Sequence, residues 1–142
     1  MENFLEHKRS AQRDFRQEGE VKTAMLKMSA LDQKFLDKVI SIIEHNMKKG
    51  IDVDINTIAR EVGLSKSSFY RKIKLITDLS PVEFVKNIRL KHAYELLEGG
   101  ETSLDAIAYS TGFSGAKYLS TCFKEQFGIT PTEFLRKRGL VD

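Results

Sequence analysis

Residues 103–134 have the sequence SLDAIAYSTGFSGAKYLSTCFKEQFGITPTEF, and residues 54–84 have the sequence DINTIAREVGLSKSSFYRKIKLITDLSPVEF. These two stretches are copies of one pattern. The segment from Ile58 to Ser65 recurs 49 residues later, and the segment from Phe69 to Phe84 recurs 50 residues later. The second copy therefore contains one extra residue just after its glycine turn. A repeat of this length defines the structural unit from which the rest of the fold is built.

Each copy is predicted to contain a short helix, a turn of about four residues, a second helix and then the start of a third helix. Ala59 and Ala108 are small residues on the inner face of the first helix, so two helices can cross closely there. Gly63 and Gly112 can adopt the backbone angles of a tight corner. This combination is typical of a helix-turn-helix, and finding it twice is a stronger indication than either copy alone.

Capping residues mark where the helices begin. Asp54 and Thr102 or Ser103 are expected to cap the first helix of each copy, and Ser65 and Ser114 the second. Each of the motifs at 80–83 and 130–133 places a proline and a glutamate after a hydroxyl N-cap, which starts a further helix. The helix over 81–98 should end at the glycine pair 99–100. Its buried side is predicted to consist of Phe84, Val85, Ile88, Ala93, Leu96 and Leu97.

Apolar residues at helical spacing between 32 and 48 predict one more helix, which ends at Gly50. No stretch shows the alternation of a strand. The predicted fold class is therefore all-α, with about seven helices. Two helix-turn-helix subdomains are joined by a central linker helix and preceded by a partly helical N-terminal arm.

Composition removes several classes of protein. The chain has 142 residues, of which 41% are apolar and 30% charged, with 2 Pro and 9 Gly, as in a soluble globular domain. No apolar run approaches the length of a membrane span, and the first residues lack a signal-peptide pattern, so we expect a cytoplasmic protein without membrane contact. Cys122 is the single cysteine, and the three histidines are scattered. A disulfide, a metal site, a cofactor and thiol or metal catalysis are therefore not expected.

The net charge of +3 is small, but the basic residues are unevenly distributed. Residues 63–100 hold 7 basic and 4 acidic side chains. Within this segment, residues 64–77 contain four basic side chains and no acid: Lys66, Arg71, Lys72 and Lys74. On a helix, these residues would give a locally positive surface.

The stretch from Ile107 to Pro131 resembles the signature of the AraC/XylS family of transcription regulators. The resemblance covers about residues 31–138. It divides the chain into an arm (1–30), a DNA-binding domain (31–138) and a short tail (139–142). Within that domain lie a first helix-turn-helix at about 54–77, the linker helix at 81–98 and a second helix-turn-helix at about 103–127.

Within the family, the segments 70–74, 79–81 and 88–90 look most like output domains of response regulators, including the hybrid two-component systems of Bacteroidetes. The segment from Phe4 to Arg9 resembles the basic connector that follows a receiver domain in such proteins. The resemblance therefore implies a C-terminal fragment of a longer regulator. Dimers would form through upstream domains, and RNA polymerase would be a further partner.

The resemblance implies sequence-specific binding of double-stranded DNA rather than catalysis. In a helix-turn-helix, the second helix enters the major groove, so two such helices predict a bipartite operator. The residues expected to contact bases are Ser67, Tyr70, Arg71, Ala116, Lys117, Ser120 and Thr121. The residues expected to hold phosphates are Lys66, Lys72, Lys74 and Lys124, with the backbone amides at Ser65 and Ser114.

Two alternatives stay open at this point. The same basic helix could dock an acidic protein partner, such as a polymerase subunit, in which case the chain is a helical interaction module. A preference among DNA sequences would separate these two functions. Tyr70 and Tyr118 could also complete the hydrophobic core instead of facing a ligand.

Overall fold

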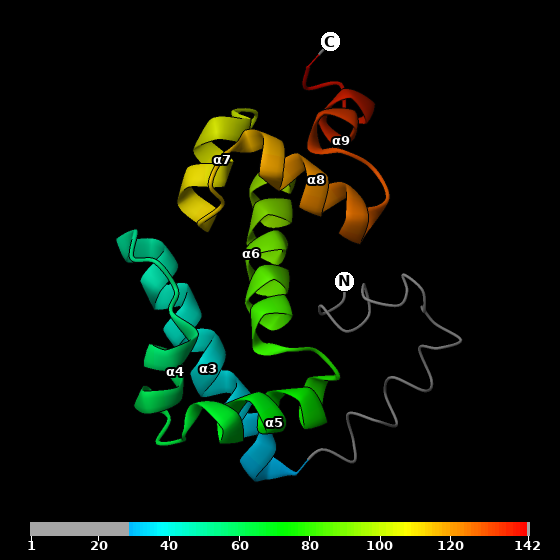
Figure 1. The fold of residues 1–142 in the computed structure, drawn as a ribbon. Helices are drawn as coiled ribbons and strands as arrows, with labels where there is room; N and C mark the ends of the chain where they lie inside the picture. Colours follow the sequence, from blue (N-terminus) through cyan, green and yellow to red (C-terminus); the bar gives the residue numbers. More distant parts are fainter. Residues whose placement is uncertain (1–28, 142) are drawn as a thin grey trace, which may run out of the picture. The chain divides into compact units, whose positions relative to one another are not determined.

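A computed structural model describes residues 29–141, and all regular secondary structure in this range is helical (Figure 1). The predicted all-α class with two helix-turn-helix subdomains is therefore confirmed. Of the predicted arm, residues 1–28 lie outside the described residues. The helices are α3 (Ala30–Lys49), α4 (Ile55–Glu61), α5 (Lys66–Thr77), α6 (Pro81–Glu98), α7 (Leu104–Thr111), α8 (Ala116–Phe127) and α9 (Pro131–Lys137).

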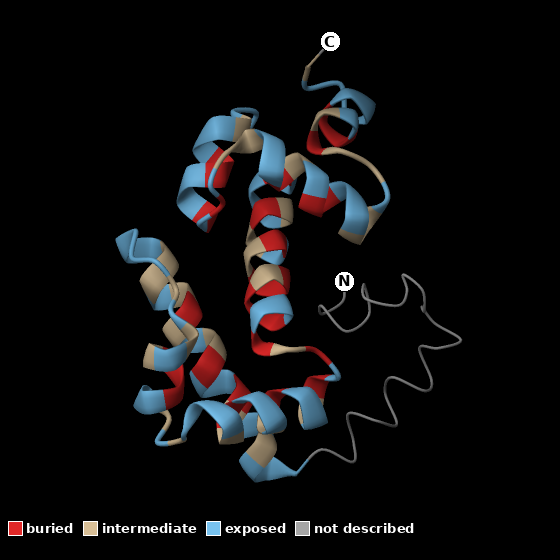
Figure 2. Cartoon of the chain, in the orientation of Figure 1, coloured by how far each residue is buried: buried red, intermediate tan, exposed pale blue. Residues whose placement is uncertain are grey.

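The described residues divide into two compact units, residues 29–88 and residues 89–141, with the boundary inside α6. Each unit has its own hydrophobic core. In the first unit, α3, α4, α5 and the start of α6 bury a cluster centred on Val39, Ile43, Ile58, Phe69, Ile73 and Phe84. In the second unit, the rest of α6 and α7, α8 and α9 bury a cluster centred on Leu90, Leu97, Ile107, Leu119, Phe123 and Leu135. Figure 2 shows buried segments in red alternating with exposed segments in pale blue along the helices.

Each unit contains one helix-turn-helix of the predicted form. Residues 62–65 join α4 to α5, and residues 112–115 join α7 to α8, so both turns have four residues. Ala59 and Ala108 are each only 2% exposed, which matches their expected place between two crossing helices. Gly63 and Gly112 have φ angles of 80° and 85°, in the left-handed region that glycine adopts without strain.

Most of the predicted helix caps form, but one was wrong. The side chains of Asp54, Ser65, Ser103 and Thr130 each accept a hydrogen bond from a backbone amide in the first turn of the following helix. Ser114, in contrast, does not cap α8. The N-cap is Gly115, which has no side chain to offer. The extra residue of the second copy therefore moves the cap position by one.

One predicted core position of α6 was also wrong. Leu96 is 37% exposed, whereas Leu90 is 1% exposed although its burial was not predicted. In the second unit, α6 buries Leu90, Ala93 and Leu97, which are spaced three and four residues apart on one face. Leu96 lies about 100° around the helix from Leu97 and so falls outside this face.

Candidate DNA-binding surface

Helix α5 has one buried face and one exposed face. It begins after Ser65, whose Oγ accepts a hydrogen bond from the Ser68 amide at 3.2 Å. Phe69, Ile73 and Thr77 are buried in the first unit. The opposite face carries exposed polar and charged side chains, all of them predicted site residues: Lys66, Ser67, Tyr70, Arg71 and Lys74. Because the buried face fixes the helix, these side chains project together toward solvent.

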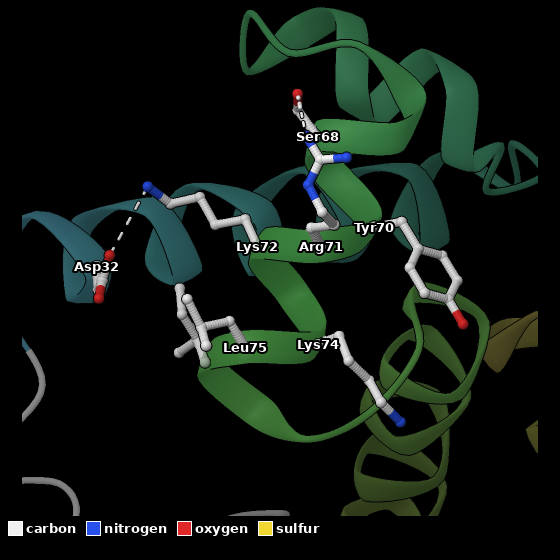
Figure 3. A pocket seen from close by; sticks show the side chains of 8 residues that line it. Asp32, Ser68, Tyr70, Arg71, Lys72, Lys74 and Leu75 are labelled. Carbon is white, nitrogen blue, oxygen red and sulfur yellow. Dashed lines mark hydrogen bonds and ion pairs between the residues drawn. The ribbon is translucent and has the colours of Figure 1, made fainter.

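Arg71 lies in the middle of this exposed face. One of its terminal nitrogens, Nη2, is 3.5 Å from Ser68 Oγ, a long hydrogen bond one helical turn away (Figure 3). Sequence reasoning did not single out Ser68, although its spacing of three residues from Arg71 was a usable signal. The planar guanidinium carries five N–H donors in a fixed fork, which suits two parallel bonds to one acceptor pair.

Tyr70 and Lys74 flank Arg71. Tyr70 is 50% exposed, so it does not complete the core as the alternative interpretation would require. Lys74 Nζ donates to the backbone oxygen of Asp78 at 3.4 Å, near the end of the helix. An open depression beside the first turn of α5 is lined by Ser65, Lys66, Ser67, Tyr70 and Arg71.

Lys72 points away from this face. Its Nζ lies 3.7 Å from Asp32 Oδ1 and 4.9 Å from the centre of the Phe35 ring, both on α3 (Figure 3). The structure therefore gives Lys72 a contact within the unit that sequence reasoning missed. Its predicted role as a phosphate-binding residue stays a prediction.

Helix α8 is the counterpart of α5 at an offset of 50 residues, and both helices have 12 residues. Leu119, Cys122 and Phe123 are buried. Of the predicted site residues, Ser114, Lys117, Thr121 and Lys124 are exposed, and Ala116 and Ser120 are partly buried. Apart from Ser114, which lies in the preceding turn, these side chains therefore occupy the face of α8 that corresponds to the exposed face of α5.

The chemistry of the two exposed faces differs. At the offset of 50, Thr121 corresponds to Arg71 and Ser120 to Tyr70. The Thr121 hydroxyl donates to the Lys117 carbonyl at 3.2 Å, which occupies its donor within the helix. Tyr118 is 51% exposed, and its ring packs edge-on against Phe113 with 5.7 Å between the ring centres. Tyr118 is therefore held beside the turn rather than buried in the core.

A capping box formed by Thr130 and Glu133 starts α9. The Thr130 amide donates to Glu133 Oε1 at 2.8 Å, and the Glu133 amide donates to Thr130 Oγ1 at 3.1 Å. The hydrogen bond from the Thr130 backbone lowers the pKa of Glu133, and the charges of Lys124 and Lys137 lower it further. The positive charge of Lys124, on α8, therefore favours the carboxylate form of Glu133.

Two other features of residues 29–141 bear on the kind of site. This part of the chain contains no group of three or more His, Cys, Asp or Glu side chains that could hold a metal ion. None of its helices is both long and apolar enough to cross a membrane.

Comparison with known proteins identifies the class to which this arrangement belongs. The family described as a helix-turn-helix domain matches residues 58–137. A transcriptional regulator with an AraC-type DNA-binding domain from Chromobacterium violaceum superimposes with a TM-score of 0.68 and 28% identity over 78% of this chain and 96% of that one. The DNA-binding domain of AdpA, solved with a target DNA, superimposes with a TM-score of 0.64 and 26% identity over 73% and 94%.

A curated relative, histidine kinase P4 of Formosa agariphila, is 32% identical over 94% of this chain but only 10% of its own length. The chain spans about a third of the length of other curated relatives, which include the transcriptional activators named RhaS. The chain belongs to the helix-turn-helix family, as a DNA-binding domain of the AraC type found in transcription regulators.

Proposed function

We propose that this chain binds a bipartite site on double-stranded DNA by placing α5 and α8 in the major groove. The observation that carries this proposal is the exposed face of α5, where Ser67, Tyr70 and Arg71 lie together opposite the buried Phe69 and Ile73. In a helix-turn-helix, the outward face of the second helix is the one that meets base edges.

The base contacts follow from side-chain chemistry. Arg71 donates two hydrogen bonds to O6 and N7 of one guanine, a contact that contributes about 1–3 kcal/mol of discrimination. Ser67 and Tyr70 contact neighbouring bases. On α8, Lys117 contacts a guanine, Ala116 a thymine methyl group, and Ser120 and Thr121 the bases beside them.

The phosphate contacts surround these base contacts. Lys66, Lys74 and Lys124 are exposed lysines on the same helices, and the backbone amides at Ser65 and Ser114 lie just before the first residues of α5 and α8. Lys72 joins this set only when it leaves Asp32, to which it is paired at 3.7 Å. We therefore rank Lys72 below Lys66 as a phosphate contact.

The wider role is that of an output domain in a two-component system. Its support is the match to histidine kinase P4, of which this chain corresponds to one tenth. In this proposal, the protein acts in the cytoplasm on promoter DNA and has no catalytic site in this domain. Phosphorylation of an upstream receiver pairs two copies, and the resulting avidity raises occupancy without new base contacts. RNA polymerase is a further partner of the bound complex.

Selection from a random duplex library at two salt concentrations tests this function. The enriched site is then measured with wild type, Arg71→Ala, Lys117→Ala and, as a matched loss of charge, Lys38→Ala on the exposed side of α3. We expect a motif with two blocks about one helical turn apart. Arg71→Ala should relax one block, Lys117→Ala the other, and Lys38→Ala neither.

Binding that depends on salt but enriches no motif would contradict the proposal for the single domain. The same selection with an artificially dimerised chain then decides between two explanations. A motif that appears only in the dimer shows that avidity is required. No motif in either form, together with binding to an acidic protein partner, shows that the chain is an interaction module.

A further inference from the structure

The turn of the second helix-turn-helix is packed against a side chain from α6. Gly112 ends α7 in a left-handed conformation with φ of 85°. A Cβ atom placed on Gly112 would lie 3.0 Å from Nε of Arg89, 3.4 Å from Cζ and 3.5 Å from Nη2. A side chain at 112 would therefore be in tight contact with the Arg89 guanidinium, which would have to move by a few tenths of an ångström.

The corresponding turn of the first unit lacks this contact. Gly63 has nearly the same backbone conformation, with φ of 80°. Apart from Gly63 itself and its two neighbours in the chain, no atom of the described residues lies within 4 Å of a Cβ built there. Both glycines thus have a conformational reason to be glycine, but only Gly112 also has a steric one.

Arg89 is well suited to hold this turn. It lies on α6 within the second unit, is partly exposed, and its Nε is shielded from solvent. Its cation is next to the C-terminal residue of α7, where the partial charge of a helix is negative. A flat group can pack closely against a glycine backbone. Its positive charge also stabilises the C-terminal end of α7.

We infer that Arg89 is a positioning residue that fixes the 112–115 turn and thereby the direction of α8 from α7. This inference rests on the proposed function, because the direction of α8 matters for base contacts only if α8 enters DNA. Residues 112–115 are the only covalent link between α7 and α8, so a shift at Gly112 passes to Ala116 and Lys117 in the first turn of α8.

The first part of the test measures stability, without DNA. Thermal melting is compared for Gly112→Ala, Gly63→Ala, Arg89→Ala and the double variants of Arg89→Ala with each glycine variant. We expect Arg89→Ala to recover part of the melting temperature lost by Gly112→Ala and none of that lost by Gly63→Ala. Equal behaviour of the two glycine positions overturns the inference, whatever the DNA results are.

The second part measures base preference. Arg89→Met keeps the length of the side chain and removes its charge and flat group, Arg89→Lys keeps the charge, and Lys91→Met is the matched control on the exposed side of α6. Arg89→Met should lose about tenfold in affinity for the full site, equivalent to about 1.4 kcal/mol, and relax the block contacted by α8 while leaving the α5 block unchanged. Arg89→Lys should fall between Arg89→Met and wild type.

Relaxation of both blocks to the same extent would mean that Arg89 only supports folding and would overturn the inference. Retention of the α8 block in a folded Arg89→Met would also overturn it. A wild-type chain that selects no motif contradicts the proposed function instead, and the melting experiment still decides whether Arg89 and Gly112 are coupled.

Discussion

At the scale of single residues, Asp78 has a backbone conformation that residues other than glycine rarely adopt. It ends α5 with φ of 65°, and it is the one residue other than glycine with positive φ in residues 29–141. Its counterpart at the end of α8 is Gly128, with φ of 87°. Aspartate tolerates this conformation better than most residues, but glycine adopts it without a steric penalty.

Replacing Asp78 by glycine should therefore stabilise the protein. We expect Asp78→Gly to raise the free energy of unfolding by about 0.5–1 kcal/mol, measured by urea denaturation. The reverse change at the matched site, Gly128→Asp, should lower it. Destabilisation by Asp78→Gly would show that the aspartate side chain contributes more than its backbone strain costs.

Single residues also show where sequence reasoning about the site succeeds and fails. The outward direction of Ser67, Tyr70 and Arg71 follows from the apolar face of the same helix, so a local pattern was enough. The direction of Lys72 depends on Asp32 and Phe35, which lie about forty residues earlier in the chain. No spacing rule within one helix contains that information.

At the scale of elements, the caps of the two recognition helices differ. Ser65 caps α5 with its side chain, whereas α8 begins after Gly115 without a side-chain cap. Ser65→Ala should lower the free energy of unfolding by about 1 kcal/mol. Ser114→Ala should change it by a few tenths at most, because Ser114 makes no capping bond. Chemical denaturation of both variants checks the pair, and equal losses would contradict this assignment of caps.

The cap of α9 predicts a dependence on pH. The pKa of Glu133 lies below its usual value of 4.5, since the Thr130 amide and the nearby lysines favour the carboxylate. A group whose pKa is lowered on folding stabilises the protein above the unfolded pKa, and this contribution is lost as pH falls through the folded pKa. The loss should therefore begin near pH 4.5 and continue below it.

Unfolding by urea at pH 7 and at about pH 3 measures this effect. Glu133→Gln should be less stable than wild type at pH 7, and the difference should shrink at the lower pH. Glu125→Gln is the matched control, because Glu125 is exposed on α8 and has no capping role. A difference between wild type and Glu133→Gln that stays constant with pH would rule out the charged cap as its source.

The same elements explain which parts of the fold could be predicted. Asp54, Ser65 and Thr130 were assigned as caps correctly, since a cap bonds to residues at most three positions away. Ser114 was assigned wrongly because the repeat allowed two alignments at the extra residue, and only the turn geometry selects Gly115. Leu96 was predicted to be buried because it is apolar. The sequence of α6 does not show which of its apolar residues face the core until the neighbouring helices are known.

At the scale of the whole chain, the two units have equivalent recognition helices with unequal chemistry. Both are 12 residues long, both end at a residue with positive φ, and both follow a four-residue turn. Yet α5 presents a tyrosine and an arginine where α8 presents a serine and a threonine whose hydroxyl bonds to its own helix. The two blocks of the operator should therefore differ in how strongly their bases are specified.

This equivalence permits a direct exchange of specificity. The triple change Lys117→Ser, Ser120→Tyr and Thr121→Arg gives α8 the outward residues of α5 while leaving the buried Leu119, Cys122 and Phe123 unchanged. Because the buried face holds the helix in place, the new side chains should occupy the positions that Ser67, Tyr70 and Arg71 have on α5. Library selection with this variant should then enrich two similar blocks, with the new guanine preference contributing about 1–3 kcal/mol. If the second block keeps its original bases in a variant that melts like wild type, its specificity comes from the shape of the DNA or from residues outside this face.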